Sequence, residues 1–327
     1  MVGKMAMQIV RDPLVGVEPP RGTVLTIGNF DGVHIGHQEI LRRVLATSHA
    51  EATLSAALTF DPHPLKLLQP KAAPRLMTTM QQRLALLERY GIEVAIVAPF
   101  THRLARMDAA EFVQRVLVDR LAVRHVYIGQ GFRFGADRKG DVALLERMGA
   151  KLGFTAHGVE PVVLDGAVVS STRIRREVAR GNVEMSWELL GRPLFVDGQV
   201  FTGERLGRKL GFPTLNTALE NELYPSHGVY ITAVYIPSFG RSFPSVTNIG
   251  VRPTVYENYS TTVESHLLDF TADVYTEKVR VFFFEKVRDE KVFPSTMKLV
   301  TQIRRDVAAA RLWFLNHPLE TLELVTL

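Results

Sequence analysis

The chain has 327 residues, 46% of them hydrophobic and 22% charged, which is typical of a globular protein with about two domains. It contains no cysteine, so disulfides, thiolate catalysis and cysteine-bound zinc are excluded. The first residues lack the apolar core of a signal peptide, and no apolar run approaches the roughly 20 residues of a membrane span. We therefore expect a cytoplasmic protein without a membrane partner.

The net charge is +5 at pH 7, and basic residues are interspersed with acidic ones along the chain. The densest basic cluster is short and comprises Arg173, Arg175 and Arg176. A basic balance can serve nucleic acid or small anionic molecules. We favour small anions and expect no nucleic-acid partner. A non-catalytic, RNA-binding regulator is the alternative that the charge alone supports.

Buried apolar runs alternate with amphipathic helical patterns in the first half of the chain. A capping box at Asp108 and Glu111 marks the start of one of these helices. Strands are expected at residues 23–30, 54–60, 93–100 and 124–129, and helices at 38–45, 81–91, 111–122 and 141–153. This alternation predicts the α/β class, with a doubly wound parallel sheet.

The pattern changes after residues 189–193, where short β-rich runs punctuated by Gly and Pro begin. These runs cover residues 194–201, 228–236, 245–250, 261–270 and 278–287. They predict a closed or nearly closed antiparallel β-barrel, followed by one long amphipathic helix at 296–315. We place the boundary near residue 187, between an N-terminal domain at 1–187 and a C-terminal domain at 188–327.

The segment GNFDGVHIGH (28–37) lies between the first strand of the parallel sheet and the helix that follows it. Sheets of this class bind ligands at that edge, where a helix N-terminus presents free N–H groups. His34 and His37 can both donate hydrogen bonds to a phosphate there, and the nearby sequence offers no third ligand that would make them a zinc pair. The other candidate phosphate-binding residues are Gly28, Asn29, Phe30, Asp31 and Gly36.

A second candidate segment, SSTRIRREVARG (170–181), has the pattern of a short helix that Ser170 or Ser171 begins and Gly181 ends. Its arginines crowd the first turns, where cations oppose the helix dipole. An anion bound between them would remove this conflict, so Ser170, Thr172 and Arg175 are candidate phosphate-binding residues. A solvated basic helix face is the simpler alternative.

The barrel half begins with a glycine- and lysine-rich loop, GERLGRKLGFPTLN (203–216), which can wrap a polyphosphate although it lacks the Walker spacing. The oxygens of Thr214 and Asn216 can complete an octahedral Mg²⁺ site together with nucleotide phosphates. A turn at the start of a strand is the alternative for this segment. The candidate nucleotide-binding residues are Gly207, Lys209, Gly211, Thr214 and Asn216.

Glu264 lies in an alternating strand, in the segment VESHLLDF, at a position where a charged residue on a barrel face would normally be avoided. A carboxylate there can accept the proton of a hydroxyl group that attacks the γ-phosphate of ATP. Glu264 is therefore the candidate general base of the barrel half. We expect an ordinary structural role for His266, which shares its face of the strand.

The HIGH tetrapeptide (34–37) and the SSTRIR segment together resemble the signatures of the nucleotidylyltransferase superfamily. Class I aminoacyl-tRNA synthetases share only the first of these, and the KMSKS-type loop that they pair with it is not found in this sequence. The chain further resembles bacterial bifunctional riboflavin kinase/FAD synthetase in the order of the segments IGNFDGVHIGHQ, TFDPHP, SSTRIRREV, LLGRP, GFPTLN, SVTNIG, VESHLLDF and VRDEKVF.

This resemblance implies a Rossmann-like FMN adenylyltransferase domain at 1–187 and a riboflavin kinase domain at 188–327. The kinase would use ATP to convert riboflavin to FMN, and the other domain would use a second ATP to convert FMN to FAD and pyrophosphate. Thr214 and Asn216 would hold the Mg²⁺ of the kinase. Glu264 would be its base, acting on the ribityl hydroxyl. Thr172 and Arg175 would hold the outgoing pyrophosphate.

The resemblance also implies that Arg288 contacts the flavin, whereas a surface ion pair with Asp289 or Glu290 is the simpler alternative. Gly131 departs from the family pattern, which has Asp or Asn at the corresponding position of the adenylyltransferase site. A kinase whose N-terminal domain binds nucleotide but is catalytically weak is therefore the alternative function. The partners expected are the small molecules riboflavin, FMN and ATP, and the sequence does not specify an oligomeric state.

Overall fold

The computed structural model describes residues 6–15, 20–203, 206–252, 260–322 and 324–325. The chain forms two compact units, one made of the residues up to 75 and 80–170, the other of 76–79 and the residues from 171 onward. The short segment 76–79 and the residues 171–190 thus pack with the C-terminal half. The predicted boundary near residue 187 marks the change in sequence pattern and stays a prediction.

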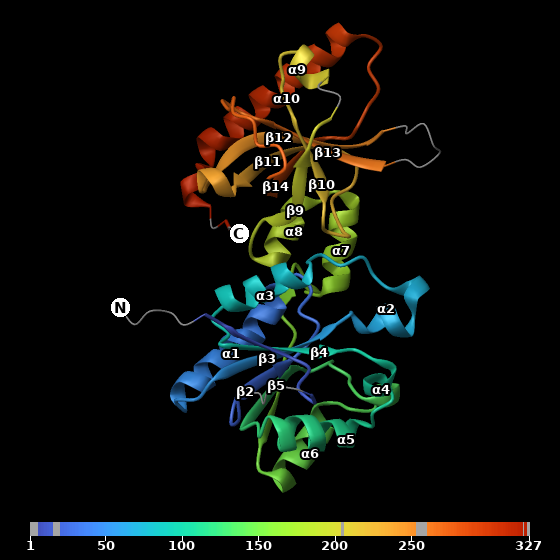
Figure 1. Ribbon diagram of the computed structural model, residues 1–327, viewed down its shortest axis with the longest axis vertical. Coiled ribbons are helices and arrows are strands. Elements are labelled where there is room, and N and C mark those ends of the chain that lie inside the picture. Colours follow the sequence, from blue (N-terminus) through green and yellow to red (C-terminus); the bar gives the residue numbers. More distant parts are fainter. Residues whose placement is uncertain (1–5, 16–19, 204–205, 253–259, 323, 326–327) are drawn as a thin grey trace. The chain divides into compact units, whose positions relative to one another are not determined.

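A six-stranded parallel sheet forms the first unit (Figure 1). The chain runs outward from β2 in both directions, so the strand order reverses between β2 and β5, which is where sheets of this type bind ligands. This confirms the predicted parallel α/β class. The strands, in their order across the sheet, are β1 (Gln8–Arg11), β4 (Val94–Pro99), β3 (Ser55–Asp61), β2 (Val24–Ile27), β5 (His125–Gly129) and β6 (Thr155–Val159).

Helices cover both faces of this sheet because its strands are apolar on both sides. On one face lie α1 (Ile35–Ala50), which contacts β2, β3 and β5, and α3 (Met80–Arg89), which packs on alternate residues of β4. The opposite face carries α5 (Ala109–Phe112), its π-helical continuation η2 (Val113–Arg120) and α6 (Val142–Leu152). The sequence predicted one helix over 111–122, and the structure divides that segment between α5 and η2.

The helix ends follow the local sequence. The side chain of Asp108 accepts a hydrogen bond from the backbone N–H of Ala110 at 2.8 Å and so caps α5 at the predicted position. Asp141 caps α6, and Gly153 ends that helix in the left-handed conformation. The first unit also contains α2 (Pro64–Leu68), α4 (His102–Ala105), the 3-10 turns at 70–72 and 136–138, and a hairpin of β7 (Val163–Leu164) and β8 (Ala167–Val168).

The second unit contains a closed six-stranded antiparallel barrel, as the sequence predicted (Figure 1). Four hydroxyl side chains are buried inside it and bond to one another at 2.6–2.8 Å, which ties β11, β12 and β13 in one register. They belong to Thr232, Ser245, Thr247 and Ser265. Around the barrel the strands are β10 (Leu215–Leu219), β13 (Ser260–Leu267), β12 (Arg241–Arg252), β11 (Gly228–Ile236), β14 (Lys278–Arg288) and β9 (Leu194–Phe201).

Helices cover parts of the barrel's outer surface. The long helix α10 (Thr296–Asn316) matches the predicted terminal helix and contacts β11 and β12. Two helices precede the barrel: α7 (Ser171–Arg180) ends at Gly181 with φ +79°, as predicted, and α8 (Val183–Leu190) packs on β14 and β9. The remaining elements are α9 (Leu206–Lys209) and the 3-10 turns at 237–239 and 319–321.

Candidate active sites

The two histidines of the HIGH turn lie together at the N-terminus of α1. His34 is the N-cap: its Nδ1 accepts a hydrogen bond from the backbone N–H of His37 at 3.3 Å, and the two rings stack with centroids 3.7 Å apart. Because Nδ1 is an acceptor, a neutral His34 carries its proton on Nε2, which becomes a donor. None of the described residues in the first turn of α1 is acidic, so the positive end of the helix dipole is available to an anion.

The backbone that leads into this helix is unusual. Phe30 and Val33 have φ angles of +48° and +41°, in the left-handed region that non-glycine residues rarely adopt. Phe30 is buried and places its ring edge against His37, with centroids 5.2 Å apart. A Cβ on Gly36 would lie 3.2 Å from the His34 ring, so only glycine fits there without a shift. Strain of this kind is typical of turns that hold a functional geometry.

The remaining predicted residues of the first unit lie around the same turn. Gly28 bonds to the Leu58 carbonyl at the end of β2, the Asn29 carbonyl accepts from Thr59, and Asp31 is buried. Ser170 follows Val169, whose carbonyl oxygen is 3.7 Å from the place that a Cβ on Gly36 would take. Thr172 and Arg175, by contrast, lie on α7 in the second unit, and their role at this turn stays a prediction.

Gly131 lies just after β5, the strand that pairs with β2 at the point where the strand order reverses. It therefore follows the neighbouring strand end to the one that leads into the HIGH turn. A Cβ added to Gly131 would meet no atom within 4 Å. Since its φ is not in the left-handed range, the larger side chain found in the family fits this position without strain.

Two cavities in the second unit share one wall. The smaller, of about 190 Å³, lies between the 203–216 loop and residues 270–275. The larger, of about 400 Å³, lies between the barrel and α10. Thr214 and Asn216 line both cavities, and Glu264 lines the larger one. The predicted metal-binding pair therefore stands where ligands in the two cavities would meet.

A single register row crosses the larger cavity. Asn216 on β10 pairs with Glu264 on β13, which pairs with Asn248 on β12. Asn248 in turn pairs with Val229 on β11, and Val229 with Arg288 on β14. All five residues line the cavity. Adjacent strands are about 4.8 Å apart, so Glu264 lies about 5 Å from Asn216 along the row and about 14 Å from Arg288.

The loop that carries Thr214 is held in place by close contacts. A Cβ on Gly207 would clash with the Phe212 carbonyl oxygen, which explains the predicted glycine. Gly211 has φ +85°, a value that favours glycine. His266 bonds to the Pro213 carbonyl at 2.8 Å through Nδ1 and so orients the loop, which is a structural role of the kind expected. Glu204, Arg205 and the side chain of Lys209 lie outside the described residues.

Arg288 makes an ion pair that sequence analysis did not find. Its Nε and Nη2 bond to both carboxylate oxygens of Asp306 on α10, at 2.8–3.2 Å, rather than to the side chain of Asp289 or Glu290. Asp306 is 3% exposed and lines the larger cavity. One sequence signal could have revealed it, because Leu299, Ile303, Asp306 and Val307 follow a helical period and an acid stands among apolar residues on that face.

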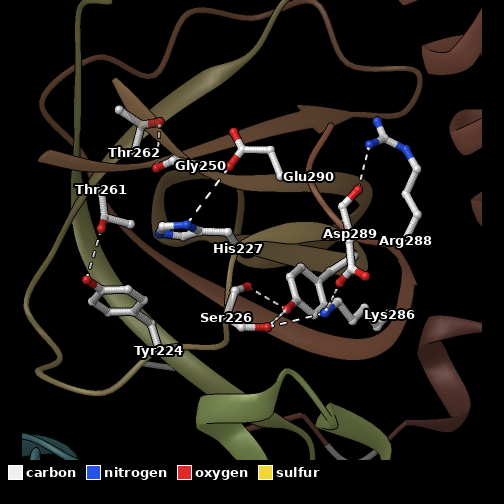
Figure 2. A network of polar contacts seen from close by, with 11 residues as sticks. Tyr224, Ser226, His227, Gly250, Thr261, Thr262, Lys286, Arg288, Asp289 and Glu290 are labelled. Carbon is white, nitrogen blue, oxygen red and sulfur yellow. Dashed lines mark hydrogen bonds and ion pairs between the residues drawn. The ribbon is translucent and has the colours of Figure 1, made fainter. Parts of the chain in front are cut away.

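The end of β14 is supported by a further polar network, which Figure 2 shows. Lys286 Nζ bonds to the carboxylate of Asp289 at 2.7 Å and to Ser226 Oγ at 3.3 Å. The buried Tyr230 donates its hydroxyl proton to the Ser226 carbonyl at 2.6 Å, and burial raises the pKa of Tyr230 to about 12. Asp289 is thus engaged by Lys286, which leaves Arg288 to pair with α10.

Among the described residues, no group of three or more His, Asp or Glu side chains could hold a metal ion. A metal bound mainly by nucleotide phosphates and completed by Thr214 and Asn216 agrees with this. In the described part of the chain, no helix is long and apolar enough to cross a membrane. A doubly wound sheet with a HIGH turn at its reversal point, joined to a barrel with a two-cavity site, defines a class of two-part enzymes that transfer phosphorus-containing groups.

Comparison with known proteins specifies the class. The FAD synthetase family matches residues 17–173, and the riboflavin kinase family matches residues 190–314. The bifunctional riboflavin kinase/FMN adenylyltransferase of Pseudomonas fluorescens is 42% identical over 306 residues, which cover 93% of this chain and 97% of that protein. Its namesake in Escherichia coli K12 is 37% identical over 90% of this chain and 94% of that protein. This chain therefore belongs to the family of bifunctional riboflavin kinase/FMN adenylyltransferases.

A crystal structure from Streptococcus pneumoniae, described as a macrolide-efflux protein, is similar in fold. It aligns with 94% of this chain and 99% of its own, with a TM-score of 0.84 and 27% sequence identity. The match extends the agreement in fold over both halves of the chain.

Proposed function

We propose that the barrel phosphorylates riboflavin along the row from Asn216 to Arg288, and that the parallel-sheet unit adenylylates the resulting FMN at the HIGH turn. Riboflavin kinase and FMN adenylyltransferase are the two activities of this chain. The observation that carries the site assignment is the wall of Thr214 and Asn216 between two cavities, with Glu264 in the next register position.

In the kinase reaction, ATP occupies the smaller cavity and riboflavin the larger one. The terminal ribityl hydroxyl attacks the γ-phosphorus of ATP, and Glu264 accepts its proton as the new O–P bond forms and the bond to ADP breaks. Thr214 and Asn216 hold the phosphates at the shared wall, so the reaction depends mainly on positioning. Mg²⁺ bound by these two oxygens and by the phosphates would neutralise the charge on the transferred group.

In the adenylyl transfer, a phosphate oxygen of FMN attacks the α-phosphorus of ATP, and pyrophosphate leaves on the opposite side. No enzyme nucleophile is needed. The Nε2 donor of His34, the ring of His37 and the free N–H groups of α1 stabilise the developing negative charge. Ser170, Thr172 and Arg175 hold the outgoing pyrophosphate.

The alternative of a kinase with a catalytically weak N-terminal domain has less support, because both halves of the chain match enzyme families. The match to bifunctional enzymes over most of the chain likewise disfavours the RNA-binding regulator. Small molecules remain the proposed partners, and the cytoplasmic location expected from the sequence stays a prediction.

One assay tests both reactions. The purified chain is incubated with riboflavin, ATP and Mg²⁺, and FMN and FAD are separated by chromatography over time. FMN should appear first and FAD later, and excess EDTA should stop FMN formation. Failure to convert supplied FMN to FAD would favour the kinase-only alternative, and failure to form FMN would contradict the assignment of the barrel.

A further inference from the structure

The ion pair between Arg288 and Asp306 is buried in the wall of the larger cavity. Their side chains are 17% and 3% exposed, and Gln302 donates a further hydrogen bond from Nε2 to the Asp306 carboxylate at 2.7 Å. A buried carboxylate without partners would strongly favour its neutral form, whereas here three N–H groups bond to it. Asp306 therefore fixes the plane and the direction of the Arg288 guanidinium.

The fixed guanidinium has donors to spare. An arginine carries five N–H groups, and the contacts of the described residues account for three of them in Arg288. The Nε–H and one Nη2–H meet Asp306, and one Nη1–H meets the Asp289 carbonyl oxygen at 3.1 Å. One N–H on each terminal nitrogen remains, and these two form the parallel fork that suits a pair of adjacent acceptors.

The flavin ring system offers acceptor pairs of that kind on one side only. In riboflavin, O4 lies beside N5 and O2 lies beside N1, both on the pyrimidine side, whereas the dimethylbenzene side has no acceptor. Arg288 stands about 14 Å along the register row from Glu264. A flavin whose ribityl end meets Glu264 can thus place its ring system near the arginine.

We infer that Asp306 is a positioning residue of the kinase: it holds Arg288 so that the free fork reads a carbonyl oxygen and the adjacent ring nitrogen of the flavin. This inference rests on the proposed assignment of the larger cavity to riboflavin. Asp306 could otherwise serve only as an anchor of α10 on β14. The two roles differ in one respect, since an anchor does not distinguish one flavin ring from another.

The test combines variants of the full chain with flavins that lack one acceptor. In 5-deazariboflavin N5 is replaced by C–H, and in 1-deazariboflavin N1 is replaced in the same way. The kcat/KM for phosphorylation of each flavin is measured in wild type, Asp306→Asn, Arg288→Lys and Asp269→Asn. Asp269→Asn is the matched control, because Asp269 makes an equally short ion pair with Arg311 at the exposed surface.

Wild type and Asp269→Asn should disfavour one of the two analogues by about 10-fold in kcat/KM, the typical value of one well-placed hydrogen bond. Asp306→Asn should lower kcat/KM for riboflavin by about 10-fold, mainly through KM, and should no longer discriminate against that analogue. Arg288→Lys keeps the charge but lacks the fork, so it should also lose the discrimination. Conversion of supplied FMN to FAD should be unchanged in all variants.

Three results would overturn the inference: equal use of all three flavins by wild type, an equal loss for all three in Asp306→Asn, or unchanged discrimination in Asp306→Asn. Should Asp306→Asn fail to fold, Arg288→Lys decides alone, since persistent discrimination in that variant contradicts reading by the fork. Glu264→Gln tests the site assignment itself. Wild-type FMN formation in Glu264→Gln would remove the kinase site, whereas loss of activity there with unaltered Asp306→Asn would remove only the positioning role.

Discussion

Glu264 stands one register position from Asn216 and lines the cavity proposed for riboflavin. Replacing it with glutamine keeps the shape and removes the proton acceptor. We expect Glu264→Gln to lower the rate of FMN formation by about 10²–10⁴-fold, the usual contribution of a general base. The rate of FAD formation from supplied FMN serves as the control and should stay at the wild-type level. FMN formation at the wild-type rate would show that another group accepts the proton.

His34 and His37 need different substitutions because His34 also caps α1. His37→Ala removes only a ring, whereas His34→Asn keeps a cap acceptor and removes the Nε2 donor. Each change should reduce FAD formation from FMN by about 10²–10³-fold, the typical effect of losing one preorganised donor. Riboflavin phosphorylation should be unchanged. Measured pyrophosphate release that is unaffected by both changes would contradict the role of the HIGH turn.

Gly131 is a position where the fold tolerates the side chain that the family pattern has. Because a Cβ there meets nothing within 4 Å, Gly131→Asn should leave the melting temperature within about 2 °C of wild type. One added polar contact is worth about 0.5–1.5 kcal/mol if it forms, so kcat/KM for adenylylation should rise by about 2–12-fold. Steady-state kinetics with FMN and with ATP check this. A decrease would show that the open space itself is used by a ligand.

At the scale of elements, a histidine pair links β5 and β6. His125 Nδ1 and His157 Nε2 are 3.1 Å apart, and the other nitrogen of His125 meets Glu51, just after α1, at 2.6 Å. Burial, and secondly the charge of His125, lower the pKa of His157, while Glu146 acts in the opposite direction. The folded chain therefore binds fewer protons than the unfolded chain just below the ordinary value of 6.5.

It follows that the stability of the first unit should fall as the pH drops through 6.5 towards the lowered pKa of His157. The melting temperature of wild type and of His157→Gln, measured from about pH 7.5 to about pH 5.5, tests this. The variant should lose part of the acid sensitivity. Identical pH profiles would show that the pair does not contribute to it.

At the scale of the whole molecule, the barrel unit depends on residues from the first half of the chain. Leu76 and Met77 lie in a segment that packs with the second unit: the Met77 carbonyl accepts from the buried Asn221 at 2.8 Å, and the Leu76 carbonyl from the backbone of Leu223 at 3.1 Å. Met77 is 2% exposed. Ahead of the barrel, Trp187 of α8 packs on Phe284, with ring centroids 5.7 Å apart.

These contacts predict how a kinase fragment behaves. A fragment of residues 171–327 should fold and phosphorylate riboflavin, but it should be less stable than the same unit in the full chain by about 1.5–3 kcal/mol for the Met77 side chain alone. A fragment that starts at residue 188 cuts α8 and should be less stable again. Denaturant unfolding and the kinase assay compare them. A shorter fragment that equals the longer one in stability would contradict the role of α8.

The sequence by itself determined the α/β class, the closed barrel, the terminal helix and the HIGH turn, because periodicity, caps and glycines are local properties of the chain. It also singled out Glu264, since a charge in an alternating strand conflicts with burial. Only the tertiary structure decided what stands beside these residues. The register that puts Asn216, Glu264 and Arg288 in one row comes from pairing across five strands, and the pair of Arg288 with Asp306 joins residues 18 apart on different elements. The packing of segment 76–79 with the barrel unit is equally non-local, because such contacts depend on how distant parts of the chain pack, which no local pattern encodes.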